Sequence, residues 1–423
     1  MTIALPLFAA DGMPLKIKLA HSLRREQWRA AALIAPLFIF ILASFLVPIL
    51  MMLWNAVYDP DIRNTMPQTS ALLQNWDGKA IPDEAVFTSF ATELKAAQKE
   101  RNAALIGKRL NYELSTLKSK VTVTARKLEA VDHGPWKEAL IAIEPAWGNV
   151  ETWATIKHAS STLTPFYILA ALDLKQSPTG DIQAVPAERQ IYRQIILRTF
   201  MISSFVTLMT LVLGFPVAYY IAMQPQGRAN ILLVFVLLPF WTSLLVRTTA
   251  WSILFLNGGV IAQILDVTGI TWVLNHLGLI AGEPELFKTR LATIVAMTHI
   301  QLPFTLLPIY SVMKTISPNY MRAARSLGAK PLYAFLTVYL PLTLPGIAAG
   351  CLLTFILSLG YYITPALVGG PTDSMIAGFI ESSMNFEGNW GKASALGAIL
   401  FLATLILYYV YNRLVGIDKL KLG

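Results

Sequence analysis

Cysteine and histidine, which often act as nucleophiles, bases or metal ligands, are few in this 423-residue sequence. Cys351 is the only cysteine, and His299 lies in a different apolar stretch with no third partner beside either residue. A reactive nucleophile needs an adjacent base, and a metal site needs several ligands at close spacing. The five histidines do not provide that spacing. The sequence therefore predicts no catalytic residue, no metal site and no bound cofactor.

A second group of polar and aromatic residues interrupts long apolar stretches. Its members are Trp241, Thr242, Ser243, Arg247, Trp251, His299, Gln301, Tyr361, Tyr362 and Thr364. Polar groups inside a membrane span are costly and usually face a cavity, and aromatic rings attract organic cations. We interpret these residues as candidates for lining a solute path. The alternative is that the Trp and Tyr rings are interfacial anchors and that Arg247 reaches the membrane surface.

Three prolines lie in the same apolar stretches, at positions 239, 303 and 365. A proline has no backbone N–H and its ring clashes with the preceding turn. We therefore expect Pro239, Pro303 and Pro365 each to interrupt a helix and to free carbonyl groups that line the path.

One short segment, 314–341, carries cations only. It contains Lys314, Arg322, Arg325 and Lys330 and no acid, between long apolar runs. A loop of this kind is typical of the cytoplasmic side of a membrane protein, where Lys and Arg accumulate.

The composition shows what kind of protein contains these residues. Hydrophobic residues make up 55% of the chain and charged residues 14%, whereas about a quarter of a soluble protein is charged. The net charge of +9 does not indicate nucleic acid binding, because the cations lie beside apolar runs rather than on one basic soluble face. The sequence predicts an integral membrane protein.

A helix that crosses a membrane needs about 20 apolar residues. Six stretches meet this requirement, near 30–55, 199–223, 231–255, 291–313, 342–367 and 393–414. The first is longer than the apolar region of a signal peptide and no cleavage site follows it, so we expect it to remain in the mature chain. The predicted fold is an all-α membrane protein with six spans.

The Lys and Arg distribution predicts the orientation. Cations cluster before the first span, in 314–341 and in the C-terminal tail, whereas Asp373, Glu381 and Glu387 lie between the last two spans with no cation among them. By the positive-inside rule both termini and 314–341 are cytoplasmic. The predicted parts are 1–29, a cytoplasmic segment; 30–58, the first span; 59–190, an outer insert; 191–415, a five-helix core; and 416–423, a cytoplasmic tail.

The insert 59–190 contains 16 acids and 15 bases, 31 of the 59 charged residues, which predicts a soluble, mainly helical domain on the outer side. Within it, 85–132 is predicted as helix with Phe87, Phe90 and Leu94 on one face. The apolar segment 164–172 is too short to span and is predicted as a core helix of the insert.

Between the third and fourth spans, 257–287 with Trp272 predicts a helix at the outer interface, or alternatively an ordinary surface loop.

The basic loop has a local pattern of its own. Pro318 favours the first turn of a helix that runs to Leu327, Gly328 favours its left-handed cap, and Pro331 favours the start of the next helix. Tyr320, Ala323, Ala324 and Leu327 share one face of this helix, and the two alanines allow another surface to approach closely. The pattern indicates a small helix that docks into a partner.

The order Ala323-Ala324, Gly328 and Val338-Tyr339-Leu340-Pro341 resembles the cytoplasmic EAA loop of permease subunits of binding-protein-dependent ABC importers. Arg322 stands where that family pattern has Glu. The stretches 238–251, 302–329 and 359–371 are similar to the spermidine/putrescine-type branch. The resemblance covers the first span and 191–415, and the insert lies outside it.

The resemblance implies the type I permease arrangement in a bacterial inner membrane, with no ATP hydrolysis by this chain, and no G-x-x-x-x-G-K-[ST] motif is present. It implies three protein partners in addition to membrane lipid: a cytoplasmic ABC ATPase dimer, a second permease subunit and a periplasmic substrate-binding protein. Contacts to the ATPase would come from Tyr320, Arg322, Ala323, Ala324, Leu327, Gly328 and Pro341. The implied cargo is putrescine, spermidine or a related small amine, with an opine, a phosphonate or iron as alternatives.

Two other classes of protein remain as rivals. An ion-coupled secondary transporter would show repeated halves and intramembrane acids, and the spans near 231–255, 291–313 and 342–367 contain no Asp or Glu. An intramembrane enzyme would have to rely on His299 and Cys351, which lack a third partner. Dependence of uptake on ATP rather than on an ion gradient distinguishes the importer from the first rival.

Overall fold

The computed structural model describes residues 15–278, 282 and 284–415. The chain divides into two compact units, Met1–Asn55 and Ala56–Gly423. The predicted tail 416–423 and the first part of the predicted segment 1–29 lie outside the described residues.

The N-terminal unit is one long helix. It consists of α1 (Leu15–Ile41), a π-helical turn (Leu42–Leu46) and α2 (Val47–Asn55). The π-helical turn lies just before Pro48, where the wider turn accommodates a residue that cannot donate a backbone hydrogen bond. Within Glu26–Asn55 an 18-residue stretch has a mean hydropathy of 2.7, so this helix is long and apolar enough to be the first span.

The second unit begins with the insert, which is mainly helical as predicted. Its elements are α3 (Asp61–Thr65), α4 (Pro67–Gln74), α5 (Glu84–Lys99), α6 (Ala103–Glu113), α7 (Leu117–Leu128), α8 (Trp136–Ile143), α9 (Val150–Ala159), α10 (Phe166–Ala171), β1 (Leu174–Gln176) and β2 (Ile182–Ala184), with short 3₁₀ turns at Pro145–Gly148 and Ala187–Arg189. The two strands pair antiparallel.

The single helix predicted over 85–132 is wrong, because the chain turns twice within it. Arg101 (φ 62°) ends α5 and Thr116 (φ 79°) precedes α7, both in the left-handed region. The apolar face was predicted correctly: Phe87, Phe90 and Leu94 are fully buried. Their helix α5 packs on α4, α7 and α8, so the insert has a core of its own.

The helix predicted at 164–172 exists as α10, but it does not lie in that core. Its buried residues Tyr167 and Ala171 pack with Ile195, Ile376 and Leu396. These last three residues belong to the helices that follow the insert. The segment therefore joins the insert to the rest of the second unit.

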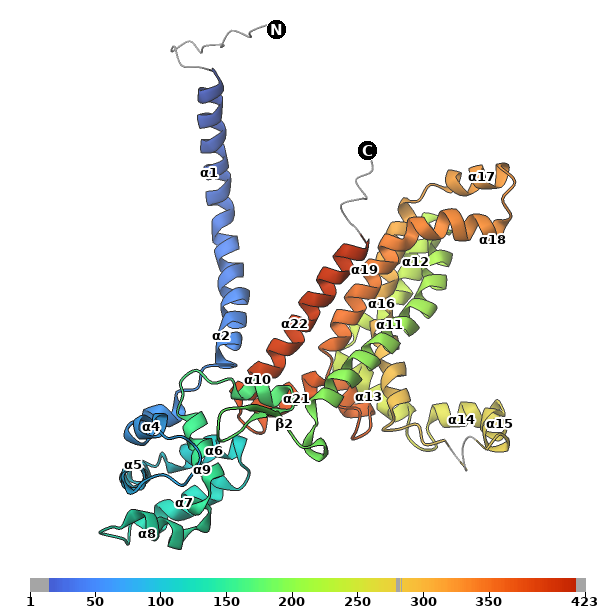
Figure 1. The fold of residues 1–423 in the computed structure, drawn as a ribbon. Helices are drawn as coiled ribbons and strands as arrows, with labels where there is room; N and C mark the ends of the chain where they lie inside the picture. The colour runs from blue at the N-terminus through green and yellow to red at the C-terminus, as the bar shows by residue number, and fades with distance from the viewer. Residues whose placement is uncertain (1–14, 279–281, 283, 416–423) are drawn as a thin grey trace. The chain divides into compact units, whose positions relative to one another are not determined.

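The remainder of the unit is a helical bundle (Figure 1). Its long helices are α11 (Tyr192–Ala222), α16 (Arg290–Thr315), α19 (Leu340–Leu359) and α22 (Trp390–Val415), and the shorter ones are α12 (Gln226–Leu237), α13 (Leu244–Leu254), α14 (Val260–Val267), α15 (Ile270–His276), α17 (Pro318–Ser326), α18 (Pro331–Ala334), α20 (Ile363–Val368) and α21 (Ile376–Asn385). Figure 1 shows α17 and α18 at one end of the bundle and α14, α15 and α21 at the other.

The predicted third span, 231–255, is not one straight helix. Residues Gln226–Trp241 and Leu244–Leu254 meet at an angle of 91°. Pro239 lies in a 3₁₀ turn at the break, and Ser243 caps α13 by accepting a hydrogen bond from the Val246 N–H (3.2 Å). The described residues thus contain five continuous helices suited to crossing a membrane and one bent pair, which together account for the six predicted spans.

Two other predictions about helix breaks need correction. Pro303 does not interrupt its helix, because α16 continues through both Pro303 and Pro308. The predicted fifth span, 342–367, ends early: the helix runs from Pro331 to Leu359 and a separate helix, α20, follows. Pro365 lies within α20.

The predicted interfacial segment 257–287 contains two short helices, α14 and α15, rather than one. Its residues 279–281 and 283 lie outside the described part of the chain. Trp272 is exposed, as are Ile264 and Val267 on α14. An exposed apolar surface of this kind suits the membrane interface.

Small residues allow a close helix contact in the bundle, between α16 and α19. A Cβ atom at Gly350 would lie 2.5 Å from the Thr305 carbonyl oxygen, and one at Gly346 would lie 2.9 Å from the Val312 side chain. The two glycines are four residues apart, so they lie on the same face of α19 and allow the backbones to approach.

We predict that Gly350→Ala destabilises the bundle by about 1–3 kcal/mol, because the added methyl group forces two packed backbones apart. Thermal unfolding of the purified protein measures the effect. The control is Gly227→Ala in α12, where an added Cβ meets no atom within 4 Å. Equal melting temperatures for the two variants would contradict the role of Gly350.

Candidate functional site

The basic loop folds as its sequence predicts. Ser317 caps α17 by accepting a hydrogen bond from the Asn319 N–H (3.3 Å), and Pro318 occupies the first turn. Gly328 has φ +89°, and the Ala329 N–H bonds to the Ala324 carbonyl (3.1 Å), which closes the helix end. Only glycine adopts this backbone conformation without strain.

One side of α17 packs on the bundle and the other is free. Met321 contacts the cluster that includes Met313 and Tyr339. Tyr320 is 56% exposed and Leu327 is 89% exposed. Large apolar side chains presented in this way on a short, well-capped helix indicate a surface that binds a partner.

The predicted face of α17 lies beside a shallow hollow. The hollow has a volume of about 600 Å³ and is lined by Ala324, Leu327, Gly328, Ala329, Lys330, Tyr333, Thr337 and Val338. The loop therefore offers both a protruding helix tip and a neighbouring recess. Arg322 is exposed on the same helix, and Ala323 is exposed as well.

The loop is tied to the bundle by aromatic rings and a π-helical turn. Phe335–Tyr339 form that turn, and the Leu340 N–H bonds to the Phe335 carbonyl. The turn precedes Pro341, which has no N–H to donate and is accommodated by the wider helix. The Tyr219 ring meets those of Phe335 (5.5 Å between centroids) and Tyr339 (5.4 Å) edge-on. Pro341 is exposed and lies in the long helix that follows the loop rather than on α17.

The structure brings some of the predicted path residues together. The Trp251 indole N–H donates to His299 Nδ1 (3.1 Å). The guanidinium of Arg247 lies over the Phe240 ring at 5.8 Å, and its Nε and one terminal nitrogen are buried without a partner among the described residues. A buried cation without an acid is costly, so this side chain is a candidate for contact with a solute or a partner subunit.

Two buried polar pairs cross between helices. The Ser358 hydroxyl donates to Gln301 Oε1 (2.6 Å), and the amide nitrogen of Gln301 has no partner among the described residues. The hydroxyls of Thr248 and Thr364 lie 3.2 Å apart. These contacts hold α16 to α19 and α13 to α20.

The remaining predicted residues are placed differently. Tyr361 is half-buried and packs on a cluster that includes Ile202 and Met297, whereas Tyr362 is 40% exposed. Trp241 is 77% exposed at the bend of the third span. The Thr242 hydroxyl donates to the Pro239 carbonyl (2.8 Å) beside it.

The sequence did not predict a buried threonine network between α11, α16 and α19. The Thr305 hydroxyl donates to Thr210 (2.9 Å) and lies 2.6 Å from the hydroxyl of Thr354. All three residues are fully buried. Isolated threonines in apolar helices give little indication of such pairing, because hydroxyls also bond to their own helix backbone.

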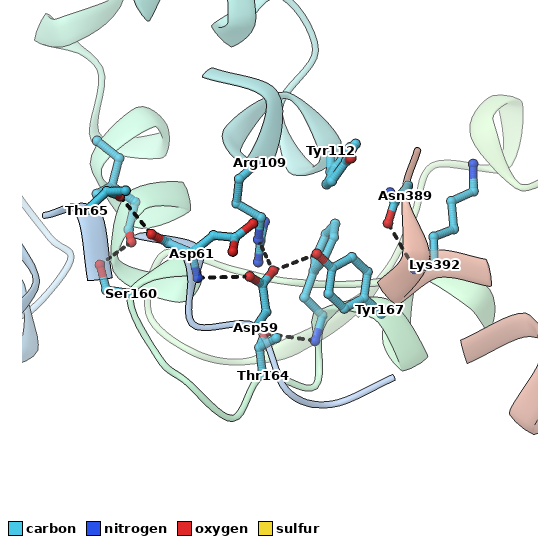
Figure 2. Close-up of polar contacts among 12 residues, drawn as sticks. Asp59, Asp61, Thr65, Arg109, Tyr112, Ser160, Thr164, Tyr167, Asn389 and Lys392 are labelled. Carbon is cyan, nitrogen blue, oxygen red and sulfur yellow. Dashed lines mark hydrogen bonds and ion pairs between the residues drawn. The ribbon is translucent and has the colours of Figure 1, made fainter. Parts of the chain in front are cut away.

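A second network that the sequence did not predict lies where the insert meets the bundle, and Figure 2 shows it. Asp59 forms a buried ion pair with Arg109, and the Tyr167 hydroxyl donates to Asp59 Oδ2 (2.6 Å). The guanidinium of Arg109 lies over the rings of Phe166 (5.0 Å) and Tyr167 (5.4 Å). Asp59 and Arg109 are 50 positions apart in the sequence.

This burial perturbs the ionisation of the network. Loss of solvent raises the pKa of Tyr167 far above its ordinary value and raises the pKa of Tyr112 to about 12. Burial opposes the charge of Arg109, but the neighbouring Tyr167 and Asp59 outweigh this effect and raise its pKa. The tyrosines therefore stay neutral and the arginine stays charged at physiological pH.

Comparison with known proteins identifies the bundle. A family model described as "Binding-protein-dependent transport system inner membrane component" matches residues 184–417. The chain belongs to this family.

Three relatives illustrate the similarity. The spermidine/putrescine transport system permease protein PotB of Haemophilus influenzae is 32% identical over 230 residues, which are 53% of this chain and 77% of the relative. The inner membrane ABC transporter permease protein YdcU of Escherichia coli is 35% identical over 239 residues, 53% of this chain and 73% of the relative. The spermidine/putrescine transport system permease protein PotC of Escherichia coli is 31% identical over 120 residues, 28% of this chain and 45% of the relative.

The protein is therefore an ABC importer permease of the type I fold, a multi-pass subunit of the inner membrane and not an enzyme. ATP hydrolysis belongs to a separate subunit in this family. Asp59, Arg109 and Tyr167 lie outside the matched residues, so the buried network belongs to an additional domain, which contacts the permease core through Tyr167.

We predict that Arg109→Leu lowers the stability of the insert by about 3–5 kcal/mol, because Asp59 is then buried without a cation. Tyr167→Phe removes one hydrogen bond to a charged group and should cost about 1.5–3 kcal/mol. Protease sensitivity of the insert in membranes and thermal unfolding report both losses. The control is Arg63→Leu, which replaces an exposed arginine of α3. Arg109→Leu would contradict the account if it behaved as this control does.

Proposed function

We propose that this permease imports polyamines, putrescine and spermidine, or a related small amine. The proposal is supported by the relatives PotB and PotC, which are named for spermidine and putrescine transport. The exposed aromatic ring of Tyr362 and the neighbouring ring of Tyr361 are suited to cation–π contact with an amine. Opines, phosphonates and iron are alternative cargoes. An ion-coupled secondary transporter is disfavoured because the chain belongs to an ABC permease family.

The importer that we propose contains three partners for this chain. A cytoplasmic ABC ATPase dimer supplies the energy, a second permease subunit completes the path, and a periplasmic binding protein delivers the substrate. Similarity to both PotB and PotC, two differently named permease proteins, supports a heterodimer of two related permeases.

In this proposal both termini and the segment 314–341 are cytoplasmic and the insert 59–190 is periplasmic. The Lys and Arg distribution supports this orientation. It is also supported by the arrangement of the core in Figure 1, where α17 lies at one end of the bundle and α14, α15 and α21 lie at the other.

The helix α17 is the proposed coupling element. Its contacts to the ATPase come from Tyr320, Arg322, Ala323, Ala324, Leu327 and Gly328, and Pro341 marks the start of the helix that carries movement into the membrane. The observation that supports this role is the almost complete exposure of Leu327 on a rigidly capped helix. When the ATPase dimer closes, a helix held in its surface moves the long helix from Pro331 to Leu359 with it.

The proposed solute path uses Trp241, Thr242, Arg247, Trp251, Gln301, Tyr361, Tyr362 and Thr364. Arg247 and Gln301 support it most strongly, because both bury nitrogens without a partner among the described residues. No acid lies in α13, α16 or α19 to bind an amine. We therefore propose that the binding protein selects the substrate and that the path accommodates it.

We predict that Leu327→Glu abolishes uptake and weakens association with the ATPase, because a charge replaces the apolar tip of α17. Co-purification from membranes and transport of labelled substrate measure the two effects. The control is Leu105→Glu, an exposed leucine of the insert. Normal assembly and transport by Leu327→Glu would rule out α17 as the coupling element.

We predict that Tyr362→Ala reduces transport several-fold without loss of assembly, because its ring is exposed and holds little of the core together. Tyr361→Ala should lower both transport and stability, because Tyr361 packs on buried residues. Uptake kinetics and melting temperature separate these effects. If neither substitution changes uptake, the tyrosines are anchors.

Uptake of labelled putrescine and spermidine by cells with and without the gene tests the cargo. Loss of uptake that is restored by the wild-type gene, but not by a variant with a bulky residue at Gly328, is the expected result. If polyamine uptake is unchanged while the protein still co-purifies with an ABC ATPase, polyamines are not the cargo. The ligand carried by the binding protein then identifies it.

A further inference from the structure

One hollow lies where the insert meets the permease core, and a second hollow adjoins it on the insert. The first has a volume of about 490 Å³ and is lined by residues of α6, α7 and α10 and, from the core, by Tyr192 and residues between 386 and 392. The second has a volume of about 390 Å³ and follows α7 from 116 to 126. Asn111 and Lys118 line both hollows. We call the joined surface the junction groove.

The junction groove is strongly positive. It is lined by Lys108, Lys118, Arg126 and Lys392, and by a single acid, Glu387. Lys392 already pairs with Glu387 at 3.0 Å. The side chains of Lys118 and Arg126 are exposed and have no ion-pair partner among the described residues. Lys108 donates to the Gly388 carbonyl, so Lys118 and Arg126 are the two cations left available for a negatively charged ligand.

Aromatic residues lie beside Lys118 in the first hollow. Tyr112 and Tyr192 line the first hollow, and Phe386 on its edge is 81% exposed. Protein interfaces concentrate their binding energy in aromatic and arginine side chains of this kind. A small anion would fill one hollow, whereas two joined hollows with an exposed apolar edge favour a protein surface.

The attachment of the groove gives it a fixed shape. Lys108 Nζ and the Tyr112 hydroxyl both donate to the Gly388 carbonyl, at 3.2 and 3.3 Å. Gly391 lies against the Tyr167 ring, where a Cβ atom would come within 2.4 Å. The walls from the insert and from the start of α22 are thus held together before a partner arrives, which reduces the entropy lost on binding.

We propose that the junction groove is the docking site for an acidic protrusion of the substrate-binding protein. Carboxylates of that protein contact Lys118 and Arg126, and an apolar side chain covers Phe386. The inference rests on the proposed function, in which a binding protein delivers substrate on the side of the insert. It assigns part of the recognition to an insert that lies outside the residues matched by the permease family.

The test measures the affinity of the substrate-loaded binding protein for the complete transporter in lipid nanodiscs. Lys118→Glu and Arg126→Glu should each weaken binding about tenfold, because opposed charges become like charges. The wild-type affinity should fall as salt rises, and the variants should show a smaller salt dependence. Phe386→Ala should weaken binding several-fold at every salt concentration.

The matched control is Lys127→Glu. Lys127 lies on α7 nine residues from Lys118, which places it on the opposite face of the helix, and it lines neither hollow. It carries the same change of charge on the same helix, and it should leave binding unchanged. Co-purification of each variant with the ATPase shows that the transporter has assembled.

Three results distinguish the possibilities. Equal affinities for the Lys118 and Lys127 variants would overturn the inference. It would also be overturned if labelled citrate bound the wild type and not Lys118→Glu while binding-protein affinity stayed constant, because the groove would then hold a small anion. If no binding protein bound or stimulated the wild-type transporter, the proposed function itself would fail.

Discussion

The close approach of α16 and α19 is the contact on which the membrane bundle depends. Lipid gives apolar helices no hydrophobic reason to associate, so packing and hydrogen bonds between helices must hold them. Gly346 and Gly350 bring the two backbones together. Thr305 then reaches both Thr210 and Thr354. A methyl group in this contact would separate the three helices that share the threonine network.

Because α16 and α19 are packed rigidly against each other, the bundle tolerates irregular backbone in neighbouring segments. The third span bends by 91° between α12 and α13, and a π-helical turn precedes Pro341. Unpaired backbone groups at such sites are tolerated in a membrane only where protein or water covers them. Buried polar pairs such as Gln301 with Ser358 lie in the same bundle. A fixed scaffold with a few adaptable polar sites suits alternating access to a solute path.

The insert depends on a different interaction. The Asp59 carboxylate is shared by Arg109 and Tyr167, and it comes directly after the first span in the sequence. A buried pair of this kind is costly unless both members are present. It therefore holds Tyr167 in the position where that residue packs on the permease core. The same junction shapes the groove that we assign to the binding protein.

Local patterns predicted much of the fold from the sequence. Apolar length indicated the spans, and Pro318 with Gly328 indicated the two ends of α17, because both signals act through the residue's own backbone. The sequence could not show that the third span bends at Pro239 while α16 continues through Pro303, because both residues are prolines in apolar runs. Packing decides between them: α16 is held on two sides by α11 and α19.

The candidate site, like the fold, could be predicted from local patterns only in part. The helix α17 could be predicted because its residues are adjacent in the sequence and its end signals are local. The ion pair of Asp59 with Arg109 could not, because 50 residues separate its members and the insert contains many other acids and bases. Hydroxyl pairs between helices leave no periodic signal either. Long-range polar contacts require the folded chain.

The central claim is that α17 contacts the ATPase, and site-directed crosslinking tests it most directly. Because Cys351 is the only cysteine, its replacement by Ala gives a background for single cysteines at Leu327 and, as a control, at Leu105. The account predicts that Leu327→Cys crosslinks to the co-purified ATPase subunit and that Leu105→Cys does not. Crosslinking to the ATPase from Leu105→Cys and not from Leu327→Cys would contradict it.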